Sequence, residues 1–138
     1  MLANKKITEI AAGQGEGPSH CELALLLYNE RRSRDLLMPA GRGLWGDPAW
    51  DMLLDLFVAN EEGRRVNIVS ACIGGCIPTT TGLRLVGQLI DAGLVVRTID
   101  QNDRRKGMLG LTSETSSAMR HYLDVVMRNR SAAFKSYD

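Results

Sequence analysis

The chain has 138 residues, of which 24% are charged, and its net charge at pH 7 is +1. A chain of this length forms one domain with a sizeable core, and so small a net charge excludes a protein that attracts its partners by overall charge. The positive charges gather in local clusters instead, and these are Arg31, Arg32, Arg34 and Arg42, then Arg64 and Arg65, and then Arg104, Arg105 and Lys106. Such patches suit a surface that binds a polyanion and releases it again.

We expect neither a secretory signal nor a membrane segment. Residues 1–6 are not followed by the uninterrupted apolar region of a signal peptide, and no apolar run approaches the length of a membrane span. A cytoplasmic protein without a membrane partner is therefore expected. The glycines and the proline within residues 11–18 indicate a flexible leader over residues 1–18, and residues 19–138 are expected to form a single domain.

Two helices are predicted at the start of this domain. Ser19 and Glu22 have the spacing of a capping box in front of an apolar run, which predicts a first helix over residues 19–38. Asp47 and Pro48 suit the cap and the first position of a second helix over residues 47–62, because proline is favoured at the first helical position.

A helix-turn-helix is predicted over residues 67–93. Asn67 is a good N-cap for a short apolar helix that two adjacent glycines end. Pro78 then suits the first turn of a second helix, which Gly93 ends in a left-handed conformation. Two helices joined by so short a turn cross at a steep angle. The apolar positions of the second helix recur at helical spacing, and they are Leu83, Val86, Leu89 and Ile90.

The other face of this second helix carries small hydroxyls, one guanidinium and one amide. These groups can hydrogen-bond base edges or phosphates in the major groove of DNA. For an arbitrary amphipathic helix, a solvated polar face is the commoner explanation. The residues in question are Thr79, Thr80, Thr81, Arg84 and Gln88.

A charged hairpin follows directly, and its position makes the DNA-binding interpretation stronger. Residues 94–99 and 108–111 have the composition of short strands, which predicts a wing over residues 94–111. Cations at its tip can neutralise phosphates or enter the minor groove, since the hairpin lies beside the same DNA backbone; they are Arg104, Arg105 and Lys106. A last helix is predicted over residues 112–130, with an apolar stripe made by Met119, Tyr122, Leu123 and Val126.

Two motifs in this region are specific. Ala92-Gly93-Leu94-Val95-Val96-Arg97 joins the second helix to the wing, and Asp100-x-x-Asp103-Arg104-Arg105 lies in the wing, which ends in Leu111-Thr112. With these motifs the chain resembles the MarR family of winged-helix transcriptional regulators. The likeness covers roughly residues 19–130, and the spacing from Asn67 to Thr112 fits without an insertion.

The resemblance implies roles for two wing residues and an assembly. In that family the Asp of the wing motif braces the Arg that enters the minor groove, and Asp103 and Arg105 occupy these positions here. It also implies a homodimer, which sets two recognition helices about one DNA turn apart on an inverted-repeat operator. The chain departs from the family after the predicted helix over residues 112–130, because no clear final helix follows it before Asp138. A smaller dimer interface, or one built more on the first helix, is therefore expected.

The resemblance further implies a site for a small aromatic effector. This site lies between the first helix, the second helix and the helices that form the dimer interface. Trp45 and Trp50 border or open the second helix, and they are the candidate effector-binding residues. Core packing is the better explanation for Trp50, because aromatic side chains contribute much of the buried area of a domain.

The cysteines indicate no metal site. Cys72 and Cys76 are separated by a helix-breaking glycine pair without His or Cys partners nearby, so zinc binding is not expected, and burial is the expected state of Cys72. Cys21 lies near the start of the first helix, where the helix dipole favours a thiolate. Peroxide-sensing members of the MarR family carry their reactive cysteine in this region, which makes Cys21 a candidate redox residue with Tyr28 as its local hydroxyl partner.

No enzyme and no cofactor are indicated. His20 and His121 lack metal-ligand spacing, and no Ser-His-Asp arrangement, glycine-rich phosphate loop or paired-carboxylate motif is present. The predicted fold is mainly α with a small β wing. The predicted function is a homodimeric repressor that binds double-stranded DNA and is released by a small molecule. The alternatives are a winged-helix module that contacts protein and has lost DNA binding, and a regulator that binds DNA constitutively.

Overall fold

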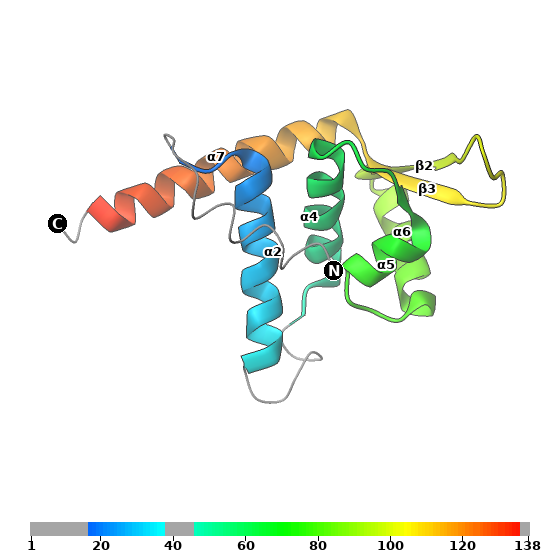
Figure 1. The fold of residues 1–138 in the computed structure, drawn as a ribbon, viewed down its shortest axis with the longest axis horizontal. Helices are drawn as coiled ribbons and strands as arrows, with labels where there is room; N and C mark the ends of the chain where they lie inside the picture. Colours follow the sequence, from blue (N-terminus) through cyan, green and yellow to red (C-terminus); the bar gives the residue numbers. More distant parts are fainter. Residues whose placement is uncertain (1–16, 38–45, 136–138) are drawn as a thin grey trace.

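The computed structural model describes residues 17–37 and 46–135 (Figure 1). Trp45, Arg42 and almost all of the predicted leader lie outside these ranges. The described residues form five helices and a small sheet, which confirms the predicted mixture of mainly helix with a small β wing. The order is α2 (His20–Leu37), α4 (Pro48–Glu61), β1 (Val66–Asn67), α5 (Ile68–Gly74), α6 (Thr79–Asp91), β2 (Val95–Ile99), β3 (Gly107–Leu111) and α7 (Ser113–Lys135).

The predicted caps start three of the helices. The Ser19 N–H donates to Glu22 Oε2 at 2.7 Å and the Glu22 N–H donates to Ser19 Oγ at 3.1 Å, which is a capping box in front of α2. Asp47 Oδ1 accepts from the backbone N–H three residues later at 3.4 Å, and Asn67 Oδ1 accepts in the same way at 2.8 Å. Each bond satisfies an N–H group that the first helical turn leaves without a backbone partner.

The sheet has three antiparallel strands in the order β1-β3-β2. Val95 pairs with Leu111 and Ile99 with Gly107 in the hairpin, while Val66 pairs with Leu109 across the other edge of β3. The hairpin was predicted, but β1 was not. Two residues cannot show the alternation by which a strand is identified, so the pairing of Val66 is visible only once the chain has folded.

Helices α5 and α6 form the helix-turn-helix, and they are bent by 101° at their junction. Gly93 has the predicted left-handed φ of 75°, but in the turn between the two helices the left-handed residue is Cys76, with φ of 58°, and neither glycine of the pair before it. Within residues 17–37 and 46–135 no single helix is long and apolar enough to cross a membrane; only the bent pair α5 and α6, taken together, has that length and composition.

Helix α4 contributes to two packed clusters. Met52, Leu56 and Ala59 face the helix-turn-helix and the sheet, in a cluster with Val66, Ala71, Val86, Leu89, Val95 and Leu109. Leu54, Phe57 and Val58 face α2 and α7, in a cluster with Leu23, Ala24, Leu25, Met119 and Leu123. The helix-turn-helix is therefore attached to α2 and α7 through α4, which lies between them in Figure 1.

Two details differ from the sequence-based prediction. Leu83 was placed on the apolar face of α6, but its side chain is 51% exposed. Gly82 takes the buried position instead, one helical turn before Val86 and beside Cys72, because only a residue without a side chain fits there. The last helix also continues to Lys135, beyond the predicted end at residue 130.

Candidate nucleic-acid interface

Helix α6 presents its polar residues to solvent. Gly82, Val86 and Leu89 are buried on the face that packs against the core. All five predicted contact residues of the helix are exposed: Thr79, Thr80, Thr81, Arg84 and Gln88. Four of them lie opposite the buried face by helical spacing, and Thr79 lies in the first turn. Their hydroxyl, guanidinium and amide groups are therefore accessible, and they can donate hydrogen bonds to base edges or phosphates.

The start of α6 is open to an anionic group. Pro78 occupies the N-cap position and has no side-chain group that accepts a hydrogen bond from the first turn. The N–H groups of that turn thus stay available at the positive end of the helix dipole. A DNA phosphate is well matched to such a helix end.

The wing holds its arginine in a defined position. Asp103 Oδ1 accepts from the backbone N–H of Arg105 at 3.1 Å and from its Nε–H at 3.3 Å. The Arg105 side chain is nevertheless 92% exposed, and Arg104 and Lys106 are exposed beside it. The tip is further ordered because the Asp100 N–H donates to the Lys106 carbonyl oxygen at 3.1 Å. The brace between the wing carboxylate and the wing arginine leaves the guanidinium reachable.

Helix α6 and the wing lie on one side of the molecule. Figure 1 shows the hairpin of β2 and β3 extending from the side that carries α5 and α6, while the end of α7 lies at the opposite side. The helix and the wing can therefore approach one surface together.

Two arginines of one predicted basic cluster are internal, whereas Arg34 of the same cluster is exposed. Arg31 Nε and Arg32 Nη2 both bind the carboxylate of Asp51, the latter at 2.7 Å. The two arginine side chains are only 17% and 18% exposed, and that of Asp51 is 1% exposed. These two arginines join α2 to α4, so they are not part of a surface patch for a polyanion.

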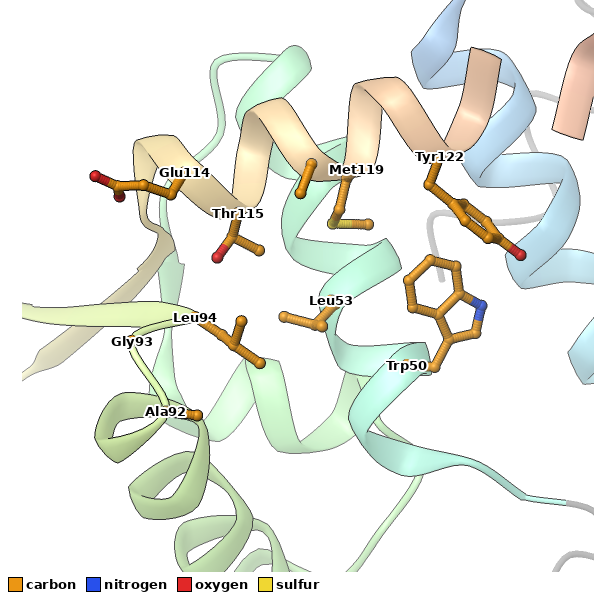
Figure 2. A pocket seen from close by; sticks show the side chains of 10 residues that line it. Trp50, Leu53, Ala92, Gly93, Leu94, Glu114, Thr115, Met119 and Tyr122 are labelled. Atoms are coloured by element: carbon orange, nitrogen blue, oxygen red, sulfur yellow. The ribbon is translucent and has the colours of Figure 1, made fainter. Parts of the chain in front are cut away.

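A cavity of about 500 Å³ lies between α4, α7 and the turn from α6 into β2 (Figure 2). Trp50 lines it, and its ring meets the ring of Tyr122 edge to face, with centroids 5.1 Å apart. Tyr122 and Met119 were predicted only as part of an apolar stripe, because the sequence does not show which elements surround that stripe. The other residues that line the cavity are Leu53, Ala92, Gly93, Leu94, Glu114, Thr115 and Ala118.

Hydrogen bonds connect the wall of this cavity to the end of α6. Thr115, which is 6% exposed, has its Oγ1 2.8 Å from Thr112 Oγ1. The Thr112 hydroxyl lies 3.0 Å from the Gly93 carbonyl oxygen and donates to it. A group that enters the cavity therefore lies next to the hydroxyl pair that holds the residue ending α6.

The cysteines occupy different surroundings. Cys72 is 1% exposed, as predicted. Cys21 is half-buried in the first turn of α2 and packs against the α2–α7 cluster, and its redox role stays a prediction. The Tyr28 hydroxyl donates to the Gly74 carbonyl oxygen at 2.8 Å and lies 3.9 Å from Cys76 Sγ. Burial raises the pKa of Tyr28 above its ordinary value.

No family model and no curated protein match the sequence, but solved structures share the fold. A mutant of MepR from S. aureus aligns with a TM-score of 0.54 and 12% identity, over 83% of this chain and 80% of that chain. NadR in complex with 4-hydroxyphenylacetate aligns with a TM-score of 0.51 and 20% identity, over 91% and 84% of the two chains.

A third similar structure is a MarR family transcriptional regulator from Silicibacter pomeroyi DSS. It aligns with a TM-score of 0.51 and 22% identity, over 79% of this chain and 64% of that chain. The chain therefore has the winged-helix fold of the MarR family of transcriptional regulators, as its helix and wing motifs predict.

Proposed function

We propose that the protein is a homodimeric transcriptional regulator of the MarR family, a repressor that binds an inverted-repeat DNA operator and is released by a small molecule. The observation that carries this proposal is that α6, whose polar residues are exposed, and the hairpin that carries the braced arginine lie on the same side of the molecule. A winged helix binds DNA through these two elements, with the helix in the major groove.

Each element has a role that follows from its groups. Arg84 is the best single contact of α6, because a guanidinium can bind a guanine edge or a phosphate with two hydrogen bonds. The threonines and Gln88 add hydrogen bonds around it. Arg105, oriented by Asp103, enters the minor groove, and Arg104 and Lys106 hold phosphates on either side.

Release by an effector is supported by the cavity. Its wall includes Gly93 and Leu94, which lie in the turn after the recognition helix, and Trp50 from α4. An effector that binds there contacts both the helix that reaches DNA and the helix that attaches it to the rest of the protein. A ligand shifts an equilibrium between two arrangements by its difference in affinity for them, and contacts at this junction provide such a difference.

Dimer formation is supported by exposed apolar side chains on the two helices away from the wing. Leu36 and Leu37 at the end of α2 are 77% and 82% exposed, and Phe134 near the end of α7 is 76% exposed. Side chains of this size gain free energy when a second copy covers them. A two-fold dimer then presents two recognition helices to the two halves of an inverted repeat.

One observation favours the alternative of a protein-binding module. Val69 and Ile73 on α5 are 55% and 62% exposed, and Leu83 on α6 is 51% exposed. Apolar side chains on the helix-turn-helix suit a protein partner better than a DNA backbone. The two functions differ in salt dependence, because phosphate contacts release counterions and make affinity fall steeply as salt rises.

Selection of genomic fragments with the purified protein, followed by titration at two salt concentrations, tests the proposal. Recovery of one inverted repeat with a steep salt slope supports the regulator. Absence of enrichment, or a shallow slope, favours the protein-binding module.

The wing is tested separately by Arg105→Ala. This substitution should weaken operator binding by about 1–3 kcal/mol without loss of stability, since the side chain is exposed and touches DNA only in the complex. Arg128→Ala is the matched control, because Arg128 is an exposed arginine on the far part of α7. Equal affinities of the Arg105 variant and the unaltered protein at physiological salt would contradict the assignment.

A further inference from the structure

The cavity beside Trp50 has walls of one chemical kind. Leu53 comes from α4, Leu94 from the turn after α6, and Met119 from α7, and Figure 2 shows them around one space that the Trp50 and Tyr122 rings close on one side. Thioether, leucine and aromatic surfaces favour an apolar and flat ligand. The volume of about 500 Å³ is within the range of sites that hold small organic molecules.

The charges around this space are unusual for a site that would hold an acid. No Lys or Arg occurs among the described residues that line the cavity, and the one ionisable carboxylate there is that of Glu114. Figure 2 shows the Glu114 side chain at the rim, directed away from the aromatic pair. The Thr115 hydroxyl is already engaged with Thr112 at 2.8 Å. An anionic group bound against these walls would therefore lose part of its water and find no cation among the lining residues to pair with.

A smaller cavity of about 230 Å³ has a cationic lining, which contains Arg31 and Arg34 with Leu27 and Glu30. Trp50 and Tyr122 line both cavities. The aromatic pair thus forms a wall shared by an apolar space and an arginine-lined space. The arginines line only the smaller space, so they are not part of the wall that a ligand in the larger space meets.

We propose that the larger cavity binds uncharged or cationic flat aromatic molecules and excludes anionic ones. The inference rests on the proposed function only in identifying this cavity as the effector site. A cation is tolerated because the faces of Trp50 and Tyr122 attract positive charge and because Glu114 at the rim contributes a negative field. The charge of the ligand, more than its shape, is the property that this wall selects.

Three probes that share one ring system and carry a neutral, a cationic or an anionic substituent of similar size test the proposal: 2-naphthylmethanol, 2-naphthylmethylammonium and 2-naphthoate. Their affinities for the full chain are measured by isothermal titration calorimetry at neutral pH. The alcohol and the ammonium ion should bind, and the carboxylate should bind at least about tenfold more weakly, because it loses hydration without gaining a partner. Binding of the carboxylate as tight as that of the alcohol, or binding of none of the three, overturns the proposal.

Variants locate the binding and separate the two cavities. Ala118 lines the larger cavity and not the smaller one, so Ala118→Phe should abolish binding of the alcohol. Arg34 lines the smaller cavity and not the larger one, so Arg34→Ala should leave binding of the alcohol unchanged. Glu114→Gln should weaken binding of the ammonium ion and leave the affinity for the alcohol unchanged. If Arg34→Ala abolishes binding of the alcohol and Ala118→Phe does not, the ligand occupies the smaller cavity and the proposal fails.

The assay contains no DNA, so its outcome is independent of the regulator proposal. Charge selection at this cavity in a protein that enriches no DNA fragment would keep the inference and overturn the proposed function. Operator binding that 2-naphthoate releases, through a site that Ala118→Phe blocks, would keep the regulator and overturn the charge selection.

Discussion

Gly82 lies where α6 packs against α5, and its lack of a side chain has a direct structural reason. A Cβ atom at this position would lie 2.4 Å from Cys72 Sγ and 2.8 Å from Cys72 Cβ. Both atoms belong to a buried side chain that has no room to move away. The close approach of the two helices in the helix-turn-helix therefore depends on this glycine.

Gly82→Ala should destabilise the protein by about 1–3 kcal/mol, which is the usual cost of overpacking a core, even though alanine is the better helix former. Gly87→Ala on the same helix is the matched control. A Cβ at Gly87 meets nothing within 4 Å, so that variant should be more stable by up to about 1 kcal/mol. Urea denaturation followed by circular dichroism measures both. Changes of the same sign in the two variants would contradict the packing argument.

The surroundings of Asp55 disfavour the ionised form of its carboxyl group. Burial raises its pKa above the ordinary carboxyl value; the charge of Arg64 lowers it, and the charge of Glu62 raises it again. Because the folded-state pKa lies above the unfolded-state one, folding favours the protonated acid. Stability from this group is thus present at low pH and is lost as pH rises from the ordinary carboxyl value through the raised one.

Asp55→Asn should therefore increase the free energy of unfolding at neutral pH, and the gain should shrink as pH falls through the raised pKa of Asp55 towards the ordinary carboxyl value. Asp124→Asn is the contrasting variant, because a hydrogen bond from His20 lowers the pKa of Asp124. Its charged form stabilises the fold, so its replacement should not stabilise the protein at neutral pH. Denaturant titrations at a series of pH values measure both. A gain for Asp124→Asn equal to that for Asp55→Asn would show that the cause is not the carboxyl environment.

Single residues differ in how far the sequence predicts them. The caps at Ser19, Asp47 and Asn67 act within three residues, so their partners are adjacent in the chain and could be named in advance. Leu83 was misplaced because the pattern of apolar side chains ignores a glycine, and Gly82 occupies the buried position. Local chemistry is visible in the sequence, but contact across two helices is not.

At the scale of elements, a buried ion cluster fixes α2 against α4. Asp51 accepts from Arg31 and Arg32, and Arg32 also lies 3.1 Å from Asp35 and 5.0 Å from the centre of the Tyr28 ring. The guanidinium is thereby held from several directions. Removal of the central carboxylate leaves two buried cations without their shared partner, which costs more than the pair contributes when intact.

Asp51→Ala should destabilise the protein by about 3–5 kcal/mol for this reason. Glu30→Ala is the control, because Glu30 binds Arg130 between α2 and α7 in a pair whose side chains are 49% and 41% exposed. An exposed pair of this kind contributes less than about 1 kcal/mol. Thermal and urea denaturation distinguish the two. Similar losses for both variants would mean that burial does not control the strength of these contacts.

The order and type of the elements were predictable to the extent that each carries its own signals. Periodicity and caps identified the helices, and the charged turn identified the hairpin. Strand β1 was missed because its two residues become a strand only by pairing with β3. The cavity was missed as a unit for the same reason, since Trp50, Leu94 and Tyr122 come from three segments far apart in the chain. Only tertiary packing joins them.

At the scale of the whole molecule, the two functional regions lie at different places along α7. The start of α7 carries Glu114 and Thr115 beside the cavity and the wing, and its far part carries Phe134 away from both (Figure 1). A dimer built on the far part of α7 and on the end of α2 would leave the DNA-facing side open. The separation allows dimer formation and operator contact to be tested independently.

Phe134→Ser should weaken the dimer, since a phenylalanine that is 76% exposed in one copy is expected to be covered by the other. Loss of an aromatic side chain that is a hot spot of an interface costs about 2 kcal/mol or more, so sedimentation velocity should show dissociation at concentrations where the unaltered protein is dimeric. Ile99→Ser is the control, because Ile99 is 61% exposed but lies in the hairpin. The Phe134 variant should still bind one half of the operator, with weaker affinity for the full inverted repeat, because two linked half-sites bind more tightly than one. Unchanged sedimentation of the Phe134 variant would place the dimer interface elsewhere. If the unaltered protein itself sediments as a monomer, the dimer that explains an inverted-repeat operator is absent.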